Sequence, residues 1–308
     1  LKLLNKNESR TSSFLTIQEG CDKFCKFCVV PYTRGPEYSR NFSEILNEAD
    51  ELIRNGSKEI ILLGQNVNAY RHGKHRLSDI INELNSHEKL ERIRYTTSHP
   101  KDMTDDLIET YQNCNKLMPL LHLPVQSGSS KILKLMNRKH NIEEYLDIVN
   151  KLREKRPSIR FSSDFIIGYP GENENDFNKT LSLMKNIEFI NSYSFIFSPR
   201  PGTPAANMKM IDEKIAKERL KIFQNVSNDI KRNYRKKLID STAKVLFENK
   251  IKNENKFFGR DEYFNSVIVK SNENLIGKTR QVKISECNQN TLFGNLVSDI
   301  KKREEYAA

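Results

Sequence analysis

Short apolar runs alternate with helical patterns along the first two thirds of the chain, and this alternation limits the possible folds more than any other feature. Six runs have the length and composition of buried strands, at residues 14–17, 59–63, 93–97, 117–123, 160–167 and 193–197. Amphipathic helical stripes follow the first five, at residues 45–53, 77–84, 104–111, 142–152 and 177–187. This order predicts parallel βαβ units in an open sheet or a partial barrel, with ligands at the carboxyl ends of the strands.

The pattern changes after Pro201. One long helical stretch covers residues 212–238, and short strand-like runs follow at residues 243–248, 265–270, 279–285 and 292–297. Runs of this length, separated by Gly, Asn and Asp, predict a small all-β unit that could close into a barrel. We therefore divide the chain into a linker remnant (1–13), an α/β domain (14–238), a β domain (239–302) and a tail (303–308). We expect the α/β domain to stay folded without the β domain.

The composition of the 308 residues narrows the class of protein. Hydrophobic residues make up 37% and charged residues 30%, as in soluble globular proteins, and no apolar run approaches the roughly 18 residues of a membrane span. The N-terminus lacks the apolar segment of a secretory signal, so we expect a cytoplasmic protein, and the start at Leu1 indicates that an upstream part is missing. A formal net charge of +11 favours a polyanionic partner such as nucleic acid.

Three of the five cysteines stand within eight residues, as Cys21, Cys25 and Cys28. Cysteines this close cannot all pair as disulfides, and a structural zinc needs a fourth ligand, for which Cys114 and Cys287 have no neighbouring Cys or His. A redox pair of Cys25 and Cys28 leaves Cys21 unused. A 4Fe-4S cluster uses all three, because three thiolates hold three irons and the fourth iron stays open for another ligand. Zinc and the redox pair remain open alternatives at this point.

The cysteine motif and several short segments resemble a known family. The C-x3-C-x-aromatic-C pattern, with Phe27 before the last cysteine, is similar to the signature of the radical S-adenosylmethionine (SAM) enzymes. The segments CVVPYTRG, LLGQNVNAY, RYTTSHP, LHLPVQSGS, MNRKH and DFIIGYPGE resemble those of the tRNA methylthiotransferases of the MiaB type. The resemblance extends from about Phe14 to the end of the chain. It implies a six-unit (βα) partial TIM barrel of radical SAM type over 14–238, followed by a small all-β TRAM barrel, an RNA-binding unit, over 239–302.

The resemblance also implies a reaction and its cofactors. Members of the family add a methylthio group to carbon 2 of isopentenyl-modified adenosine beside the tRNA anticodon. A 4Fe-4S cluster, reduced by an external one-electron donor, cleaves SAM to a deoxyadenosyl radical that removes an inert hydrogen, which no acid or base side chain could do. Members carry a second cluster on three cysteines of an upstream domain, so we expect this chain to hold one cluster and to insert sulfur poorly. We expect a monomer that binds the anticodon stem-loop of tRNA and no membrane.

Polar residues that follow predicted strands are the candidates for holding SAM. Gly64, Gln65 and Asn66 follow the second strand, where glycine permits close approach and the amides could bind the methionine amino group, although such a segment is also a common turn. In the family this loop has the cofactor role. Gln126 and Ser127 follow the fourth strand and could contact the ribose or the carboxylate of SAM, or could cap the next helix.

Three further residues complete the candidate SAM site. Phe27 belongs to the cysteine motif itself. Arg138 could hold the methionine carboxylate through two parallel hydrogen bonds, or could be a solvated arginine at a helix end. Asp164 lies inside an apolar strand, where a site role competes with a structural ion pair, and His122 could face the site or be a core histidine. No catalytic acid or base is assigned.

Basic and aromatic residues near the C-terminus are the candidates for RNA binding. Nine Lys or Arg and two acidic residues fall in residues 214–238, a net charge of +7 that could follow a phosphate backbone or belong to a solvated connecting helix. Aromatic and charged side chains alternate in the tail as they do on RNA-stacking surfaces, although several must belong to the barrel core: Phe257, Phe258, Arg260, Tyr263 and Phe264. The alternative functions are methylthiolation of threonylcarbamoyl-adenosine tRNA or of a ribosomal protein, and a non-catalytic module that binds zinc and RNA.

Overall fold

The computed structural model describes residues 10–297. Most of the predicted linker remnant (1–13) and all of the predicted tail (303–308) therefore lie outside the described residues, and the boundaries proposed for the two domains stay predictions. No helix within residues 10–297 is long and apolar enough to cross a membrane.

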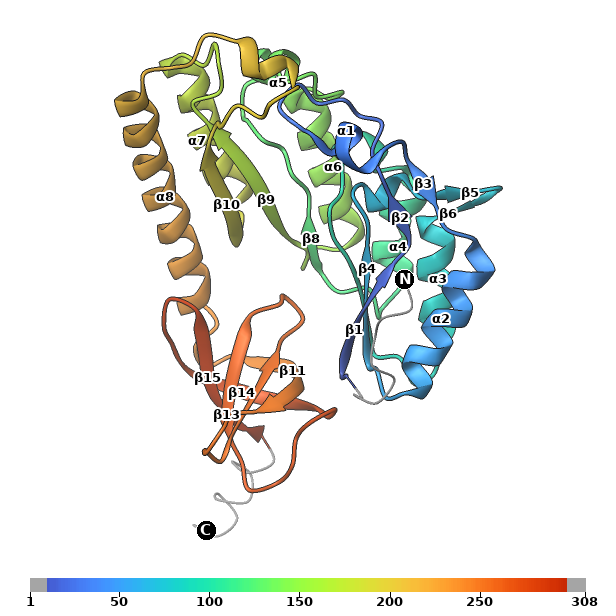
Figure 1. The fold of residues 1–308 in the computed structure, drawn as a ribbon. Coiled ribbons are helices and arrows are strands. Elements are labelled where there is room, and N and C mark those ends of the chain that lie inside the picture. The colour runs from blue at the N-terminus through green and yellow to red at the C-terminus, as the bar shows by residue number, and fades with distance from the viewer. Residues whose placement is uncertain (1–9, 298–308) are drawn as a thin grey trace.

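Six parallel strands form the wall of the α/β domain (Figure 1). One sheet has the order β1-β4-β7, built from Ser12–Thr16, Glu59–Leu63 and Arg92–Tyr95. The other has the order β8-β9-β10, built from Leu120–His122, Arg160–Ile167 and Asn191–Ile196. A parallel bridge between Ile93 and Leu117 joins the two sheets into one curved wall. The six-unit partial barrel is confirmed, with β8 shorter than the predicted run of residues 117–123.

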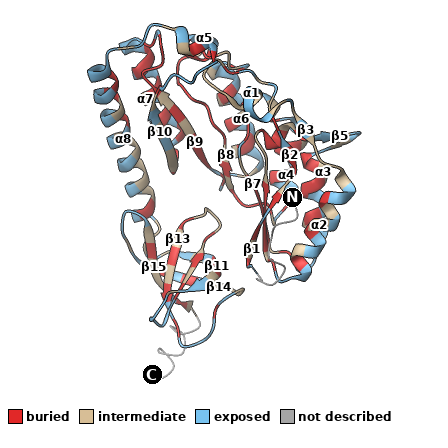
Figure 2. Cartoon of the chain, viewed as in Figure 1, coloured by how far each residue is buried: buried red, intermediate tan, exposed pale blue. Residues whose placement is uncertain are grey.

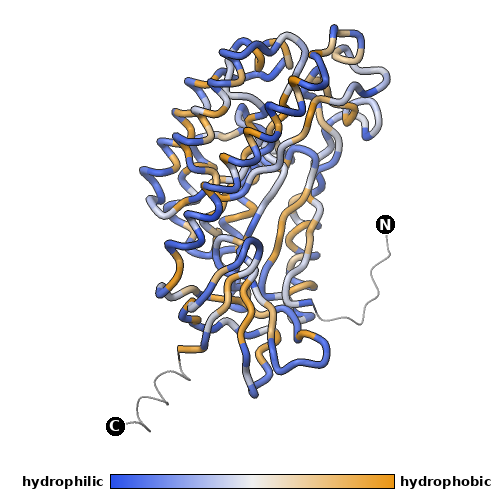
Figure 3. The backbone as a smooth tube through the Cα atoms, turned by 90° about the vertical axis from the view of Figure 1, so that its left-hand side faces the viewer, coloured by the Kyte–Doolittle hydropathy of each residue, from blue (hydrophilic) through white to orange (hydrophobic). Residues whose placement is uncertain are grey.

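Helices cover the outer face of the wall, and their caps are visible in the sequence. The long ones are α2 (Phe42–Arg54), α3 (Leu77–Ser86), α4 (Asp105–Asn113), α6 (Ile142–Lys155) and α7 (Glu174–Ile187). Asn141 and Asn173 begin α6 and α7 with capping boxes, in which the asparagine and the third helical residue bond each other's backbone N–H groups. Figure 3 shows hydrophilic and hydrophobic residues alternating along the helices, as amphipathic packing requires.

Short elements lie at the carboxyl ends of the strands or close to them. Two of them are helices, α1 (Val30–Arg34) and α5 (Ser130–Leu135). Three are 3-10 turns, η1 (Val67–Ala69), η2 (Pro100–Asp102) and η3 (Pro204–Asn207). Two are small hairpins, β2 (Gln18–Glu19) with β3 (Tyr38–Ser39), and β5 (Arg71–His72) with β6 (His75–Arg76).

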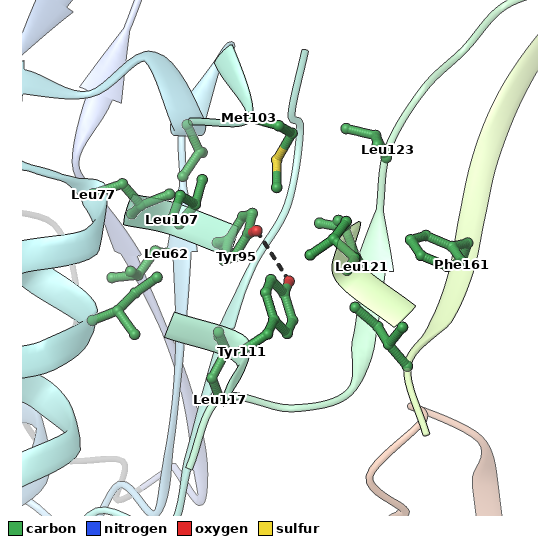
Figure 4. Packing of buried hydrophobic residues seen from close by; sticks show 14 of the residues in the cluster. Leu62, Leu77, Tyr95, Met103, Leu107, Tyr111, Leu117, Leu121, Leu123 and Phe161 are labelled. Atoms are coloured by element: carbon green, nitrogen blue, oxygen red, sulfur yellow. Dashed lines mark hydrogen bonds between the residues drawn. The ribbon is translucent and has the colours of Figure 1, made fainter. Parts of the chain in front are cut away.

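The main core lies between the wall and the helices. Alternate strand residues such as Leu15, Leu62 and Phe165 point into it and are fully buried. Two tyrosines also enter this core, where the hydroxyl of Tyr111 donates to that of Tyr95 across 3.0 Å (Figure 4). Because successive strand residues face opposite ways, the remaining positions of each strand line the concave inner face of the wall.

Helix α8 (Glu213–Lys236) packs along β10 and α7 and leads into a closed five-stranded barrel (Figure 1). The barrel has the order β11-β12-β13-β15-β14. Its strands are β11 (Thr242–Lys250), β12 (Lys256–Arg260), β13 (Ser266–Lys270), β14 (Thr279–Cys287) and β15 (Thr291–Leu296). The sequence analysis missed β12, because its aromatic residues were assigned to an RNA-binding surface. Phe257 points into the barrel core with 4% of its surface exposed, so for this residue the structure favours the core alternative over the stacking one.

The barrel docks against the start of β7, at the end of the wall opposite to α1 and α5 (Figure 1). Arg92 is 2% exposed and donates to the carbonyl oxygens of Arg260, Asp261 and Lys244 at 2.8, 3.2 and 2.7 Å. Arg94 bonds the buried Glu59 at 2.7 Å and the carbonyl of Asp261 at 3.0 Å. The two guanidinium groups thus join the barrel to the wall through a buried polar interface, and the expectation that the α/β domain stays folded without the β domain stays a prediction.

Candidate active site

The three clustered cysteines lie on one loop between β2 and α1, at the carboxyl end of the wall (Figure 1). Segments from several parts of the chain fix this loop. The N–H of Gly20 donates to Gln65 Oε1 at 2.7 Å, the N–H of Lys26 donates to the Met136 carbonyl at 2.9 Å, and Asn137 Nδ2 donates to the Phe24 carbonyl at 2.8 Å. Gly20 is required at its position, because φ is +71° and a Cβ there would lie 2.0 Å from the Pro36 carbonyl oxygen.

Burial governs the ionisation of these thiols. Cys25 is buried and the other two are half-buried. Burial raises the pKa of Cys21 to about 11 and also raises the pKa of Cys28. Arg138 Nη1 lies 3.6 Å from the Cys25 sulfur. Cys21 and Cys28 therefore need a strong positive charge, such as a bound metal, to become thiolates.

The donor set of this loop fits a polynuclear cluster, because it offers three thiols. Within residues 10–297 no three His, Cys, Asp or Glu side chains converge as ligands of one ion. A cubane does not require such convergence, because each of three thiolates binds a different iron. Buried polar atoms that have no hydrogen-bond partner among the described residues also lie in the loops around the cysteines: Asn66 Oδ1, Ser98 Oγ, His99 Nε2 and Arg138 Nε. Such atoms are typical of a site whose ligand supplies the missing partner.

The loop after β4 faces the cysteine loop and is hydrogen-bonded to it. Gln65 is engaged by Gly20, as described above, and Asn66 Nδ2 donates to Asp102 Oδ2 at 2.8 Å and to Glu37 Oε1 at 3.1 Å. A Cβ on Gly64 would lie 2.7 Å from the Gln18 carbonyl oxygen, so the close approach expected of this glycine is made to the chain itself. The structure thus gives Gly64 and Gln65 a positioning role and leaves Asn66 Oδ1 for a ligand.

Gln126 and Ser127 lie after β8 in different environments. The N–H of Gln126 donates to the Asp164 carbonyl, and its backbone has φ +77°, an uncommon conformation for a residue other than glycine. Ser127 Oγ lies 3.4 Å from Thr180 Oγ1 of α7 and accepts from the N–H of Ser129, so its hydroxyl is directed at the helix. The N-cap of α5 is Ser129, whose Oγ accepts from the N–H of Ile132, so Ser127 does not cap that helix and instead links the loop to α7.

Arg138 is not a solvated helix-end residue. Its Nη2 donates to the Pro124 carbonyl at 2.6 Å, its Nη1 faces Cys25, and its Nε has no partner among the described residues. Phe27 packs against Ile132, Met136 and neighbouring apolar residues beneath the loop. The side chain of Asp164 is on the inner face of β9, 3.5 Å from His122 Nε2 and 35% exposed.

Sequence reasoning missed the loop after β7. His99 is 4% exposed, and its Nδ1 accepts from the N–H of Lys101. Its Nε2 therefore carries the proton and is left without a partner in the described part of the chain. Burial lowers the pKa of His99 and lowers that of His140, its neighbour at a ring distance of 5.6 Å, to about 3. The available signal was position, since His99 follows a strand just as Gln65 and Gln126 do.

Strained backbone gathers around the same loops. Eight residues other than glycine have positive φ in residues 10–297, and four of them, Phe24, Thr97, Gln126 and Asn137, flank the cysteine loop or follow wall strands. Thr97 is β-branched, for which φ of +67° is unfavourable. Strain of this kind persists where the surrounding contacts impose it, commonly at functional sites.

Helix α8 presents fewer positive charges to a ligand than its composition suggests. Arg219 is buried and bonds Glu172 Oε1 at 2.9 Å, and Arg235 is buried and donates to the carbonyls of Asn288 and Gln289. Two of the nine predicted phosphate-binding cations are therefore structural. A pocket of about 670 Å³ separates the end of α8 from the barrel, and Lys231, Arg232 and Lys236 are among its lining residues.

The sequence matches known families in both domains. Residues 15–184 match the radical SAM superfamily and residues 236–297 match the TRAM domain. The chain is 61% identical over 98% of its length to the tRNA-2-methylthio-N(6)-dimethylallyladenosine synthase of Pelagibacter ubique (strain HTCC1062), and it covers 69% of that protein. It is 50% identical over 93% of its length to the synthase of the same name from Rickettsia conorii (strain ATCC VR-613 / Malish 7) and covers 66% of that protein. The chain thus spans about two thirds of the length of these relatives.

A solved structure supports the fold alone. The radical S-adenosylmethionine methyltransferase TsrM from Kitasatospora setae, solved with cobalamin and a 4Fe-4S cluster, superposes with a TM-score of 0.53 at 13% identity. The superposition covers 64% of this chain and 39% of that one.

Proposed function

Because this chain belongs to the radical SAM superfamily and, within it, to the family of tRNA-2-methylthio-N(6)-dimethylallyladenosine synthases, we propose that it adds a methylthio group to carbon 2 of N(6)-dimethylallyladenosine next to the tRNA anticodon. The observation that carries the proposal is the cysteine loop, in which three thiols stand together on a backbone fixed by loops from both halves of the wall. The relatives are longer than this chain, so the complete reaction is proposed for the whole protein.

Membership of the superfamily implies a 4Fe-4S cluster and SAM, and we assign the cluster to Cys21, Cys25 and Cys28. The bound cluster and SAM supply a radical strong enough to remove the hydrogen from carbon 2, after one electron arrives from an external donor. The chain's own residues hold and orient these groups. Arg138 fixes Cys25 by bonding both the sulfur and the Pro124 carbonyl, which holds the cysteine in place for its iron.

We assign the contacts with SAM to the polar atoms that remain unpaired. Asn66 Oδ1 is an acceptor suited to the methionine ammonium, and Arg138 Nε is a donor suited to the carboxylate. Gln126 and Asp164 lie on the adjoining part of the wall, where the rest of the cofactor would extend, and Phe27 packs beneath the loop. Gly64, Gln65 and Ser127 act in this proposal by placing those loops, because their own groups are already engaged within the chain.

The tRNA would contact α8 and the C-terminal barrel. The TRAM match and the exposed cations of α8 support this role, since Lys and Arg side chains that neutralise phosphates supply most of the affinity for nucleic acid. tRNA is a cytoplasmic molecule, so we expect the reaction in the cytoplasm. We place the second cluster, which the family resemblance implies, in the part of the relatives that this chain does not cover. The monomeric state stays a prediction.

The test is anaerobic reconstitution of the chain with iron and sulfide. We expect about four irons and four sulfides per chain in addition to deoxyadenosine formation from SAM on reduction. The full-length protein should convert N(6)-dimethylallyladenosine in tRNA to its 2-methylthio derivative, as measured by mass spectrometry of the digested nucleosides. Zinc in place of iron, or a tRNA that stays unmodified with a fully loaded full-length protein, would overturn the proposal.

A further inference from the structure

Three large aromatic side chains are exposed on the inner face of the wall. They come from the two strands that form its open edges, β1 and β10, which pair on one side only within the described residues. Phe14, Tyr193 and Phe195 are 60%, 55% and 60% exposed. All six residues of β10 are half-buried or exposed, in contrast to the buried residues of β9 beside it (Figure 2). Isolated exposed aromatics need no explanation, but three on the edges of one concave face do.

Strand alternation places these rings on the inner face. On β1, Leu15 packs in the core beneath the helices, so Phe14 points to the opposite side. On β10, Ser192 Oγ lies 2.6 Å from Ser227 Oγ of α8, which fixes the outward direction of that residue. Tyr193 therefore points inward, and Phe195 lies on the same side.

A polar pair lies beside the aromatic rings. His122 of β8 is 2.9 Å from Ser162 Oγ through Nδ1 and 3.5 Å from Asp164 Oδ1 through Nε2. The ring of Tyr193 meets that of His122 edge to face, with their centroids 6.1 Å apart. The inner face thus offers flat apolar surfaces together with a partly exposed carboxylate, of which 35% is accessible.

We propose that Tyr193 and Phe195 receive the target base, with its N(6)-dimethylallyl group, and that His122 meets the polar edge of that base. This inference rests on the proposed function. An enzyme that reacts at a ring carbon of a base must take the base out of the RNA stack, and exposed aromatic rings replace the stacking that the base loses. The dimethylallyl group is a branched hydrocarbon, so it gains from the same apolar surface.

The position of α8 supports a base rather than a free small molecule as the occupant. The helix packs directly along β10, and exposed lysines such as Lys214, Lys217 and Lys221 stand on it. A polynucleotide whose phosphates follow these lysines would pass the edge of the wall at the aromatic strand. One ligand, an RNA strand with an extruded base, would therefore contact both the lysines of α8 and the aromatic side chains of β10.

The experiment measures binding of two anticodon stem-loop RNAs that differ only in carrying N(6)-dimethylallyladenosine or adenosine. The protein is the full chain loaded with its cluster, and the variants are Tyr193→Ala, Phe195→Ala and Tyr193→Phe, with Ile276→Ala as an exposed apolar control on the C-terminal barrel. The cluster absorption spectrum checks that each variant is folded. We expect each alanine variant to lose about 5-fold to 150-fold in affinity for the modified RNA and to bring the ratio of the two affinities toward one. Tyr193→Phe and the control should keep the wild-type ratio.

The outcomes separate this inference from the proposed function. If wild-type protein prefers the modified RNA and the alanine variants keep that preference at full affinity, the aromatic site is wrong while the function stands. If the variants weaken both RNAs equally, the substituent is not received here and that part of the inference is wrong. If the wild-type protein binds the two RNAs equally, the dimethylallyl group gains nothing from this face and the inference is wrong, whereas the proposed function is tested separately by mass spectrometry of the tRNA nucleosides.

Discussion

Replacing Arg92 by methionine should uncouple the C-terminal barrel from the wall. Arg92 is buried and donates three hydrogen bonds to carbonyl oxygens of the barrel, and burial lowers its pKa from the ordinary value. Hydrogen bonds from a charged donor contribute about 1.5–3 kcal/mol each, and the cost of burying the guanidinium offsets part of that total. Methionine fills a similar volume but removes all three bonds, although the Asp261 carbonyl keeps its bond from Arg94, so we expect a net loss of about 3–5 kcal/mol.

The assay is urea denaturation followed by both tyrosine fluorescence and cluster absorption. The wild-type chain should unfold in one transition, because the docked barrel and the wall stabilise each other, whereas Arg92→Met should show the two signals separating. Arg54→Met, at an exposed position on the end of α2, is the matched control and should change the free energy of unfolding by less than about 0.5 kcal/mol. A loss for Arg92→Met that equals the control, with a single shared transition, would refute the coupling.

Three further predictions follow from the site and the surface. Alanine at any of the three motif cysteines should abolish the iron and sulfide content, whereas Cys114→Ala should retain both, because that thiol is a buried core group; iron loss in Cys114→Ala alone would contradict the ligand assignment. Burial lowers the pKa of His140 to about 3 from an ordinary 6.5, so as the pH falls below 6.5 the unfolded chain takes up a proton that the folded chain does not. The free energy of unfolding present above pH 6.5 should therefore fall by about 2 kcal/mol by pH 5. Urea titrations at pH 7 and pH 5 should show that loss reduced in His140→Gln, and an unchanged loss would count against it. Replacing Lys231 and Lys236 by glutamine should make the plot of log affinity for tRNA against log salt shallower by about 1 for each cation, while Lys155→Gln on α6 leaves the slope unchanged. Equal slopes in all three proteins would remove α8 from the RNA interface.

The elements of the wall could be predicted because their local pattern and their packing agree. The run at residues 160–167 is a strand in both sequence and structure, and its apolar residues Phe161, Phe165 and Ile167 are buried, as suits a strand between two neighbours. The prediction failed where one residue type suits two environments. In the sequence Phe257 stands among aromatic and charged residues, as a residue that stacks on RNA bases would. Only the pairing of β12 with β11 and β13 shows that its ring belongs to the barrel core.

Charge could be counted from the sequence but not located. Arg219 and Arg235 are indistinguishable from the exposed lysines of α8 in a helical pattern, yet one bonds Glu172 and the other bonds carbonyls of the barrel. Their partners lie 47 and 53 residues away in the sequence. Counting the Lys and Arg residues along α8 therefore overestimates the positive charge that this helix can offer to a phosphate backbone.

The same limit explains what could be known of the site. The three cysteines were recognisable because their spacing places all donors on one loop, whose geometry depends on few other residues. The residues that hold this loop come from separate strand ends: Gln65 is 45 positions from Gly20, and Arg138 is 113 positions from Cys25. In a parallel wall every strand end reaches the same edge, so a polar residue that follows a strand can be placed near the site from the sequence alone. Whether its side chain meets the ligand or another loop depends on the loops around it, and for this reason Gln65 and Asn66, adjacent in the chain, have different roles.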